Sequence, residues 1–176
     1  ERGGAGAGRQ GQDDQGKAEG MDYLIRQMGD VVMTKPDAEE SAEDLSEIVG
    51  LKVTEKNESG IYMSSNDRLC EIAYLKGEKT GAVAVGLEAM DAASVDEIAR
   101  RAKADGLAIV DDKPLIAGVE RAVRIATPFG PVIEIHTPVE RNQPLRHSGT
   151  GRAPTRLTHV TLSLPAPPGV RDVIAR

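Results

Sequence analysis

The segment Ile25-Arg-Gln-Met-Gly-Asp-Val-Val-Met-Thr34 decides the fold, because it has the apolar and β-branched content of a strand and a helix follows it closely. Pro36 closes the strand, and Asp37 is a suitable N-cap for the helix, with Glu40 as its capping-box partner. Gly50 is placed to end the helix. We expect the helix to bury one face, formed by Ala42, Leu45, Ile48 and Val49.

The same order of elements then occurs a second time. A strand over residues 81–90 precedes a second helix, which has Ser94 and Glu97 as a capping box and Gly106 as its end. The helix has a stripe formed by Val95, Ile98, Ala99 and Ala102. Short strands are predicted after each helix, at residues 51–55, 61–65 and 69–75 and again at 107–111, 121–127 and 131–137. The sequence therefore predicts an α+β fold made of two strand-helix-three-strand modules.

The composition limits the class of protein. The chain has 176 residues, of which 39% are hydrophobic, which suits one ordinary core with additional segments. The net charge is -6, whereas nucleic-acid-binding proteins carry clustered basic faces, so we expect no nucleic-acid partner. The sequence has neither an apolar run of about 18 residues nor a secretory signal, so we expect no membrane partner. The single cysteine, Cys70, excludes an internal disulfide and favours a reducing, cytoplasmic location.

The two ends of the chain differ from its middle. Residues 1–24 are rich in glycine and poor in apolar residues, so we expect a disordered tail. Residues 141–155 have the composition of a linker. After them, Arg156-Leu-Thr-His-Val-Thr-Leu-Ser-Leu-Pro165 alternates as a strand does and places His159 on one face. Residues 156–176 stop within a helical pattern, so we expect them to be the beginning of a second, truncated domain in a fragment of a longer protein.

Several segments, taken in order, carry a resemblance to a known family. They are Met28-Gly-Asp-Val-Val-Met33 with Leu45-Ser-Glu-Ile-Val-Gly-Leu51, then Ala84-Val-Gly-Leu-Glu-Ala89, Thr127-Pro-Phe-Gly-Pro-Val-Ile-Glu-Ile135 and the start of the strand at Arg156. Together they resemble the vicinal oxygen chelate superfamily of glyoxalases, bleomycin-resistance proteins and extradiol dioxygenases. The chain is most similar to the N-terminal part of a two-domain extradiol ring-cleavage dioxygenase. The resemblance implies that the paired βαβββ modules of residues 25–140 form a concave mixed sheet.

The resemblance also implies where a metal would be held. A metal-bearing domain of this family has two histidines and one glutamate, which bind a divalent iron on one face. The matching positions of the first domain hold Asp30, Ala84 and Glu134, and alanine has no donor atom. We therefore expect residues 25–140 to be metal-free, with Asp30 and Glu134 solvated or hydrogen-bonded.

His159 matches the first-ligand position of the second domain. The resemblance implies that it is a metal ligand in the parent protein, whose remaining ligands are absent from this chain. His136 and His147 have no metal-ligand spacing to each other or to His159, so we assign them no role.

These observations predict a fragment of an extradiol-type catechol ring-cleavage dioxygenase. The parent protein would use Fe(II), or Mn(II), with a small aromatic diol and dioxygen as substrates, and it would be a homo-oligomer. The chain itself is expected to lack a complete metal site, to bind no cofactor alone and to be inactive. The alternative is a non-catalytic small-molecule-binding protein of the glyoxalase and bleomycin-resistance fold.

Overall fold

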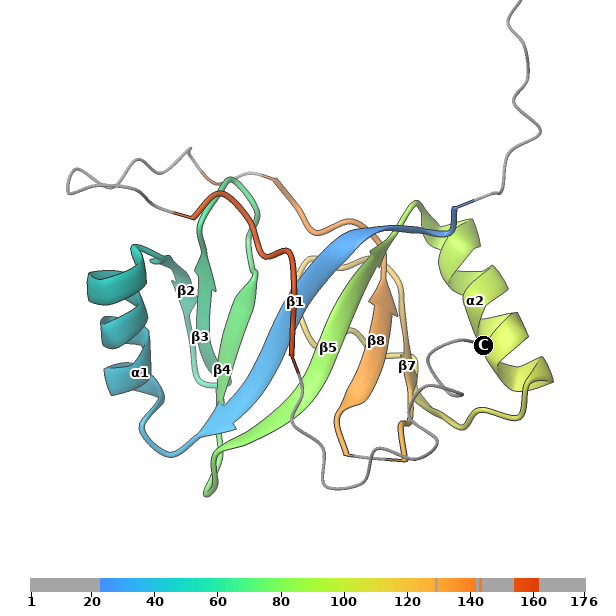
Figure 1. Ribbon diagram of the computed structural model, residues 1–176, viewed down its shortest axis with the longest axis horizontal. Coiled ribbons are helices and arrows are strands. Elements are labelled where there is room, and N and C mark those ends of the chain that lie inside the picture. The colour runs from blue at the N-terminus through green and yellow to red at the C-terminus, as the bar shows by residue number, and fades with distance from the viewer. Residues whose placement is uncertain (1–22, 129, 142, 144–153, 162–176) are drawn as a thin grey trace, which may run out of the picture.

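The computed structural model describes residues 23–128, 130–141, 143 and 154–161 (Figure 1). The expected tail at residues 1–24 lies almost entirely outside these residues. Within the described part of the chain, no helix combines the length and apolarity needed to cross a membrane. The first module consists of β1 (Ile25–Lys35), α1 (Ala38–Asp44), the π-helical turn η1 (Leu45–Val49), β2 (Lys52–Lys56), β3 (Gly60–Ser64) and β4 (Ile72–Lys76). The second consists of β5 (Gly81–Ala89), α2 (Ala92–Ala104), β6 (Ile109–Asp111), β7 (Ala122–Ile125) and β8 (Val132–His136).

The eight strands form one mixed sheet in the order β2-β3-β4-β1-β5-β8-β7-β6. The two first strands, β1 and β5, pair antiparallel at the centre, and each also pairs in parallel with the last strand of its own module. The order is therefore the same when read outward from the centre in either direction. This arrangement confirms the predicted α+β fold of two paired βαβββ modules.

Both helices pack on one face of the sheet, at opposite ends, as Figure 1 shows. The side chains of consecutive strand residues point to opposite faces of the sheet, so two residues adjacent in sequence pack on different faces. On β4, for example, Tyr74 packs with the α1 cluster, whereas Ala73 belongs to a cluster on the other face. On β8, Ile135 packs with the α2 cluster, whereas Glu134 and His136 point the other way. We call the face without helices the inner face.

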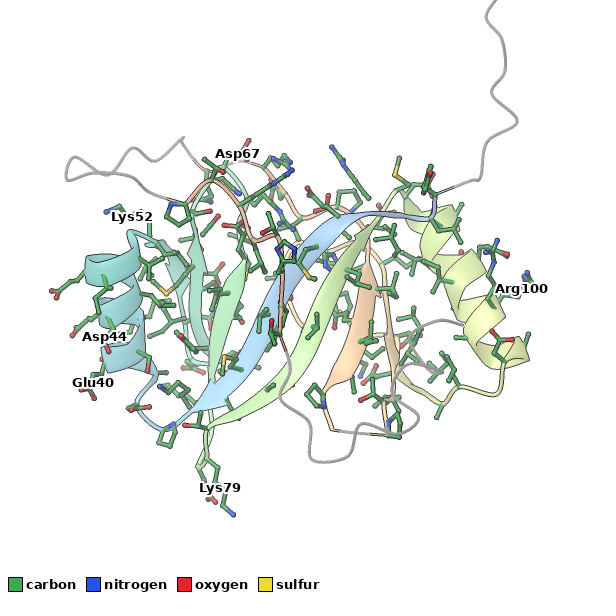
Figure 2. The ribbon with its side chains drawn as sticks, viewed as in Figure 1. Glu40, Asp44, Lys52, Asp67, Lys79 and Arg100 are labelled. Carbon is green, nitrogen blue, oxygen red and sulfur yellow. The ribbon has the colours of Figure 1, made fainter. Side chains whose placement is uncertain are left out.

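The first helix departs from the sequence prediction at both ends. The Asp37 side chain makes no capping hydrogen bond and lies 3.5 Å from the Lys35 ammonium instead, so the predicted capping box is wrong. Glu40 points away from the sheet in Figure 2. Gly50 does end the helical segment, with a left-handed φ of 85°. Ile48, expected to be buried, is 81% exposed, because the wider π turn before Gly50 rotates that side chain out of the helical stripe.

The second helix matches its predicted stripe but not its predicted cap. Val95 and Ala102 are buried against the sheet, with the other two stripe residues packed beside them. The helix begins at Ala92, and its N-cap is Asp91, whose carboxylate accepts hydrogen bonds from the backbone N–H and the hydroxyl of Ser94 at 2.8 Å each. Ser94 is therefore the partner of the cap rather than the cap itself. Glu97 instead pairs with two arginines of the helix.

The predicted strand over residues 156–165 is not a strand in its described part. Residues 154–161 form no ladder with another strand, and the last four residues of the prediction lie outside the described residues. A strand needs a paired neighbour, and the Leu157 N–H is instead bound by a side chain, the carboxylate of Glu71, at 2.8 Å. The alternation in this segment is therefore present without the hydrogen bonds that would make it a strand.

Candidate functional site

Side chains from β1 and β8 meet at the centre of the inner face. Asp30 lies on β1, Glu134 and His136 lie on β8, and β5 runs between these two strands. The β5 residue in register with Glu134 is Gly86. A Cβ atom at Gly86 would lie 2.7 Å from both carboxylate oxygens of Asp30. The absence of a side chain at Gly86 therefore lets Asp30 reach over β5, and we call Asp30, Glu134 and His136 the buried acid–histidine cluster.

His136 is the basic member of this cluster. Its Nε2 lies 3.2 Å from Oδ2 of Asp30, and both residues are at most 1% exposed. Its Nδ1 lies 2.8 Å from the carbonyl oxygen of Thr137, which can only accept, so Nδ1 carries a proton. Burial lowers the pKa of His136, but the adjacent Asp30 carboxylate outweighs it, with further contributions from Thr137 and Glu134, and raises the pKa above 6.5. When it is protonated, His136 therefore forms a buried ion pair with the Asp30 carboxylate.

The Asp30–His136 contact is an ion pair rather than a well-aligned hydrogen bond. Nε2 of His136 and Oδ2 of Asp30 both lack a hydrogen-bond partner of good geometry within the described residues. Gly29 leaves the space for the imidazole, since a Cβ atom at that position would lie 2.3 Å from Nε2. The absence of a side chain at Gly29 therefore leaves the space that the His136 ring occupies.

Glu134 is a carboxyl group that ionises with difficulty. It is 1% exposed, and its two oxygens accept only long hydrogen bonds, 3.3 Å each, from the backbone N–H of Leu115. Burial, followed by repulsion from Asp30, raises the pKa of Glu134 to about 7. Glu134 therefore remains partly protonated near neutral pH.

A buried ion pair supports the cluster from one side. The Nη2 atom of Arg68 lies 3.0 Å from Oε2 of Glu88, and both side chains are almost completely buried. Arg68 also donates from Nη1 to the carbonyl oxygen of Gly29 at 2.9 Å. The other oxygen of Glu88 accepts from Gln27 at 2.8 Å. This ion pair fixes the backbone of β1 next to the imidazole of His136.

Apolar side chains cover the inner face. Ile116 and Val119, from the segment between β6 and β7, and Val139, which follows β8, are all less than 10% exposed. They pack in one cluster with Val32 and Ala84 of the central strands. Two surface hollows among the described residues, of about 240 and 800 Å³, lie instead against α1 and are lined by none of these side chains. A ligand on the inner face would have to displace this apolar cover.

Asp30, Ala84 and Glu134, which the family resemblance places at metal-ligand positions, do not fit iron. Ala84 is buried among apolar side chains and has no donor, as predicted from the sequence. Asp30 faces the imidazole of His136, and Glu134 is partly protonated at neutral pH. In the part of the chain that the structure describes, no group of three or more His, Cys, Asp and Glu side chains is arranged to hold a metal ion.

His159 lies apart from this cluster. It is exposed, and its Nδ1 lies 2.8 Å from the hydroxyl of the neighbouring Thr158. The contact at Nδ1 leaves Nε2 as the ring nitrogen on which a metal would be accepted. His147 lies outside the described residues.

The structure corrects the view that His136 has no role. It is the ion-pair partner of Asp30, which sequence reasoning left as solvated or hydrogen-bonded. Two signals were present in the sequence. His136 follows Glu134 on the same strand face, and glycines occupy the two positions, 29 and 86, where the cluster needs space. Neither signal shows which strands lie side by side, and that information comes only from the sheet order.

The fold is shared with solved structures of extradiol catechol dioxygenases. Homoprotocatechuate 2,3-dioxygenase from Arthrobacter globiformis superimposes with a TM-score of 0.71 at 21% identity, over 87% of this chain and 49% of that one. A variant of homoprotocatechuate 2,3-dioxygenase from Brevibacterium fuscum, in complex with HPCA, gives a TM-score of 0.75 at 19% identity, over 87% and 44%. BphC, a halotolerant catechol dioxygenase, gives 0.62 at 21% identity, over 68% and 42%.

The similarity is one of fold rather than of closely related sequence. No family model matches the chain, and no curated protein matches it in sequence. The chain spans less than half the length of the dioxygenases that it superimposes on.

Proposed function

We propose that this chain is part of an extradiol-type catechol ring-cleavage dioxygenase. In this proposal residues 25–140 are a metal-free first domain, residues 141–155 are a linker and residues 156–176 begin a second domain. The observation that carries the proposal is the fold shared with catechol dioxygenases over both βαβββ modules, at TM-scores up to 0.75. The self-contained acid–histidine cluster, in which His136 supplies the positive charge, supports a first domain without metal.

The proposed metal is Fe(II), with Mn(II) as the alternative, and His159 is one of its ligands. The other ligands would come from residues beyond this chain. When bound, the metal would supply the site at which both hydroxyl oxygens of an aromatic diol and dioxygen meet. The first domain would contribute stability and an interface. We further propose that the assembled protein is a cytoplasmic homo-oligomer.

Oxygen uptake by the complete protein tests this proposal. With catechol as substrate we expect uptake that depends on iron, and with hydroquinone, whose hydroxyls are not adjacent, we expect none. The purified 1–176 chain should neither bind iron stoichiometrically nor consume oxygen. Turnover by the 1–176 chain, or no turnover by the iron-loaded complete protein with any of a panel of catechols, would contradict the proposal.

A non-catalytic small-molecule-binding protein is the second candidate. The observation in its favour is that the described residues hold no complete metal-binding group. The apolar cover of the inner face, formed by Ile116, Val119 and Val139, argues against a ligand there. A rise in the melting temperature of the metal-free protein on adding an aromatic diol would favour this candidate.

A further inference from the structure

The loop between β3 and β4, residues Ser65–Glu71, contacts the chain shortly after β8. The backbone N–H of Leu69 donates to the carbonyl oxygen of Glu140 at 3.0 Å, and the N–H of Gln143 donates to the carbonyl oxygen of Asp67 at 3.1 Å. Figure 2 shows Asp67 at the edge of the molecule where this loop lies. The loop therefore holds the chain as it leaves the first domain.

The same loop also contacts the segment of residues 154–161. The side-chain amide of Asn66 donates to the carbonyl oxygen of Thr155 at 3.0 Å. The carboxylate oxygen Oε1 of Glu71 accepts the backbone N–H of Leu157 at 2.8 Å. One short loop thus binds both ends of the connection between the proposed domains.

Glu71 is built to be a fixed anchor in this contact. Its side chain is 2% exposed. Oε2 accepts the backbone N–H of Ser65 at 2.8 Å and its hydroxyl at 2.6 Å, while Oε1 accepts the Asn66 amide at 2.9 Å. Hydrogen bonds to a carboxylate are stronger than those between neutral groups, and here they fix both oxygens. The Leu157 N–H therefore meets an acceptor that is already held in place.

We propose that Glu71 is a positioning residue for His159, and this inference rests on the proposed function. The bond from Glu71 fixes the backbone two residues before His159, in a segment that forms no strand ladder of its own. Glu71 does not touch the substrate or the metal. It acts through the backbone at Leu157, so the first domain sets the location of a ligand that belongs to the second.

The substitution Glu71→Gln tests the anchor with little change in size. An amide keeps one oxygen and replaces the other with a donor. If the oxygen stays at Ser65, the new NH₂ group faces the N–H of Leu157 and the amide of Asn66, which are also donors. The bond to Leu157 is then lost, while the rest of the loop keeps its acceptor. The matched control is Asp67→Asn in the same loop, which affects the pairing with Arg141 on the other side of the connection.

Two measurements on the complete protein report on the anchor without using activity. The first is amide hydrogen exchange of the peptide containing residues 154–161. The second is tryptic cleavage between Arg156 and Leu157, where the scissile amide is the group that Glu71 binds and Arg156 is exposed. Loss of one charge-assisted bond should speed the opening by about 10- to 100-fold in Glu71→Gln. Asp67→Asn should leave both rates at the wild-type value.

The iron site gives the second arm of the experiment. In Glu71→Gln we expect faster iron dissociation and lower turnover per bound iron, with unchanged exchange in the peptides of β1 and β5. A general loss of stability would instead reduce the amount of active protein and leave turnover per bound iron unchanged. If exchange and cleavage at residues 154–161 match the wild type, the anchor is wrong. If they accelerate while iron binding and turnover per iron stay the same, the positioning role is wrong.

The failure of the inference can be told apart from the failure of the proposed function. His159→Ala should remove iron whether or not Glu71 positions the segment, so its result addresses the ligand alone. If Glu71→Gln gives no folded protein, Asn66→Ala removes the bond to Thr155 and one donor to Glu71 at a half-buried position. It should accelerate cleavage after Arg156 to a smaller extent, and an unchanged cleavage rate would overturn the anchor.

Discussion

The substitution Asp30→Asn removes the negative charge that faces His136 within the buried acid–histidine cluster. Both side chains are at most 1% exposed, so solvent cannot replace the lost partner. Removing one member of a buried ion pair costs about 3–5 kcal/mol, because the other charge is left uncompensated. We expect a loss of this size in the free energy of unfolding at pH 5.5, where His136 is protonated in the wild type.

The pH dependence gives the sharper test of the Asp30→Asn substitution. The pKa of His136 is raised above 6.5 in the folded state, so its stabilisation is full below pH 6.5 and is lost as the pH rises through the raised value. The pKa of Glu134 is raised from 4.5 to about 7, so stability falls in the same direction between pH 4.5 and 7. The Asp30 charge contributes to both shifts, and the variant should therefore show a weaker pH dependence. The difference between wild type and variant should become smaller from pH 5.5 to pH 9, because the fraction of protonated His136 falls as the pH rises.

Urea unfolding of the 1–176 chain followed by far-UV circular dichroism measures these differences, since the sequence has no tryptophan for fluorescence. The control is Asp67→Asn, whose ion pair with Arg141 at 2.9 Å is partly exposed and should contribute less than about 1 kcal/mol at either pH. A cost below about 1 kcal/mol for Asp30→Asn at pH 5.5 would refute the ion-pair argument. An equal cost at pH 5.5 and pH 9 would refute the assignment of the charge to His136.

Two further substitutions test the surroundings of the cluster. Gly29→Ala places a methyl group 2.3 Å from Nε2 of His136 and should destabilise the chain by about 2–3 kcal/mol. The control is Gly106→Ala, where the new methyl group meets nothing within 4 Å. It should cost only about 1 kcal/mol, from the strain of a side chain at a φ of +74°. Equal losses in urea unfolding for the two alanine variants would contradict a packing role for Gly29. Arg68→Met leaves buried Glu88 with only the half-exposed Arg26, 3.8 Å away, as a cation, and should cost about 3–5 kcal/mol. The loss should be partly recovered when Glu88→Gln is added, and additive losses in this double-mutant cycle would mean that Arg68 and Glu88 do not interact.

The elements of the fold could be predicted because their periodicity is local. Strands and helices each bury one face, and the order of the two modules follows from where the period changes. The exposure of Ile48 could not be predicted, because the apolar pattern assumes regular α-helical spacing and does not reveal the π turn at Leu45–Val49. The two predicted helix caps were wrong because the contacts of the capping side chains are not set by the sequence pattern alone. The Asp37 side chain pairs with Lys35 instead of capping α1. The N-cap of α2 is Asp91, three residues before Ser94, which the pattern favoured.

The buried acid–histidine cluster depends on contacts that are distant in sequence. Asp30 and His136 lie on strands that do not pair with each other, and they meet only because Gly86 lies between them. The sequence indicated correctly that Ala84 offers no ligand, since this needs only the identity of the residue. It could not show that the His136 imidazole would lie against Asp30, because this contact depends on burial and on the sheet order.

Metal analysis of the complete protein tests the central claim most directly. The proposal assigns the iron to a site that includes His159 and leaves the cluster of Asp30, Glu134 and His136 without metal. We predict about one iron per chain in the wild type and in Glu134→Gln, and loss of that iron in His159→Ala. Iron that persists in His159→Ala, or that disappears in a folded Glu134→Gln variant, would contradict the account.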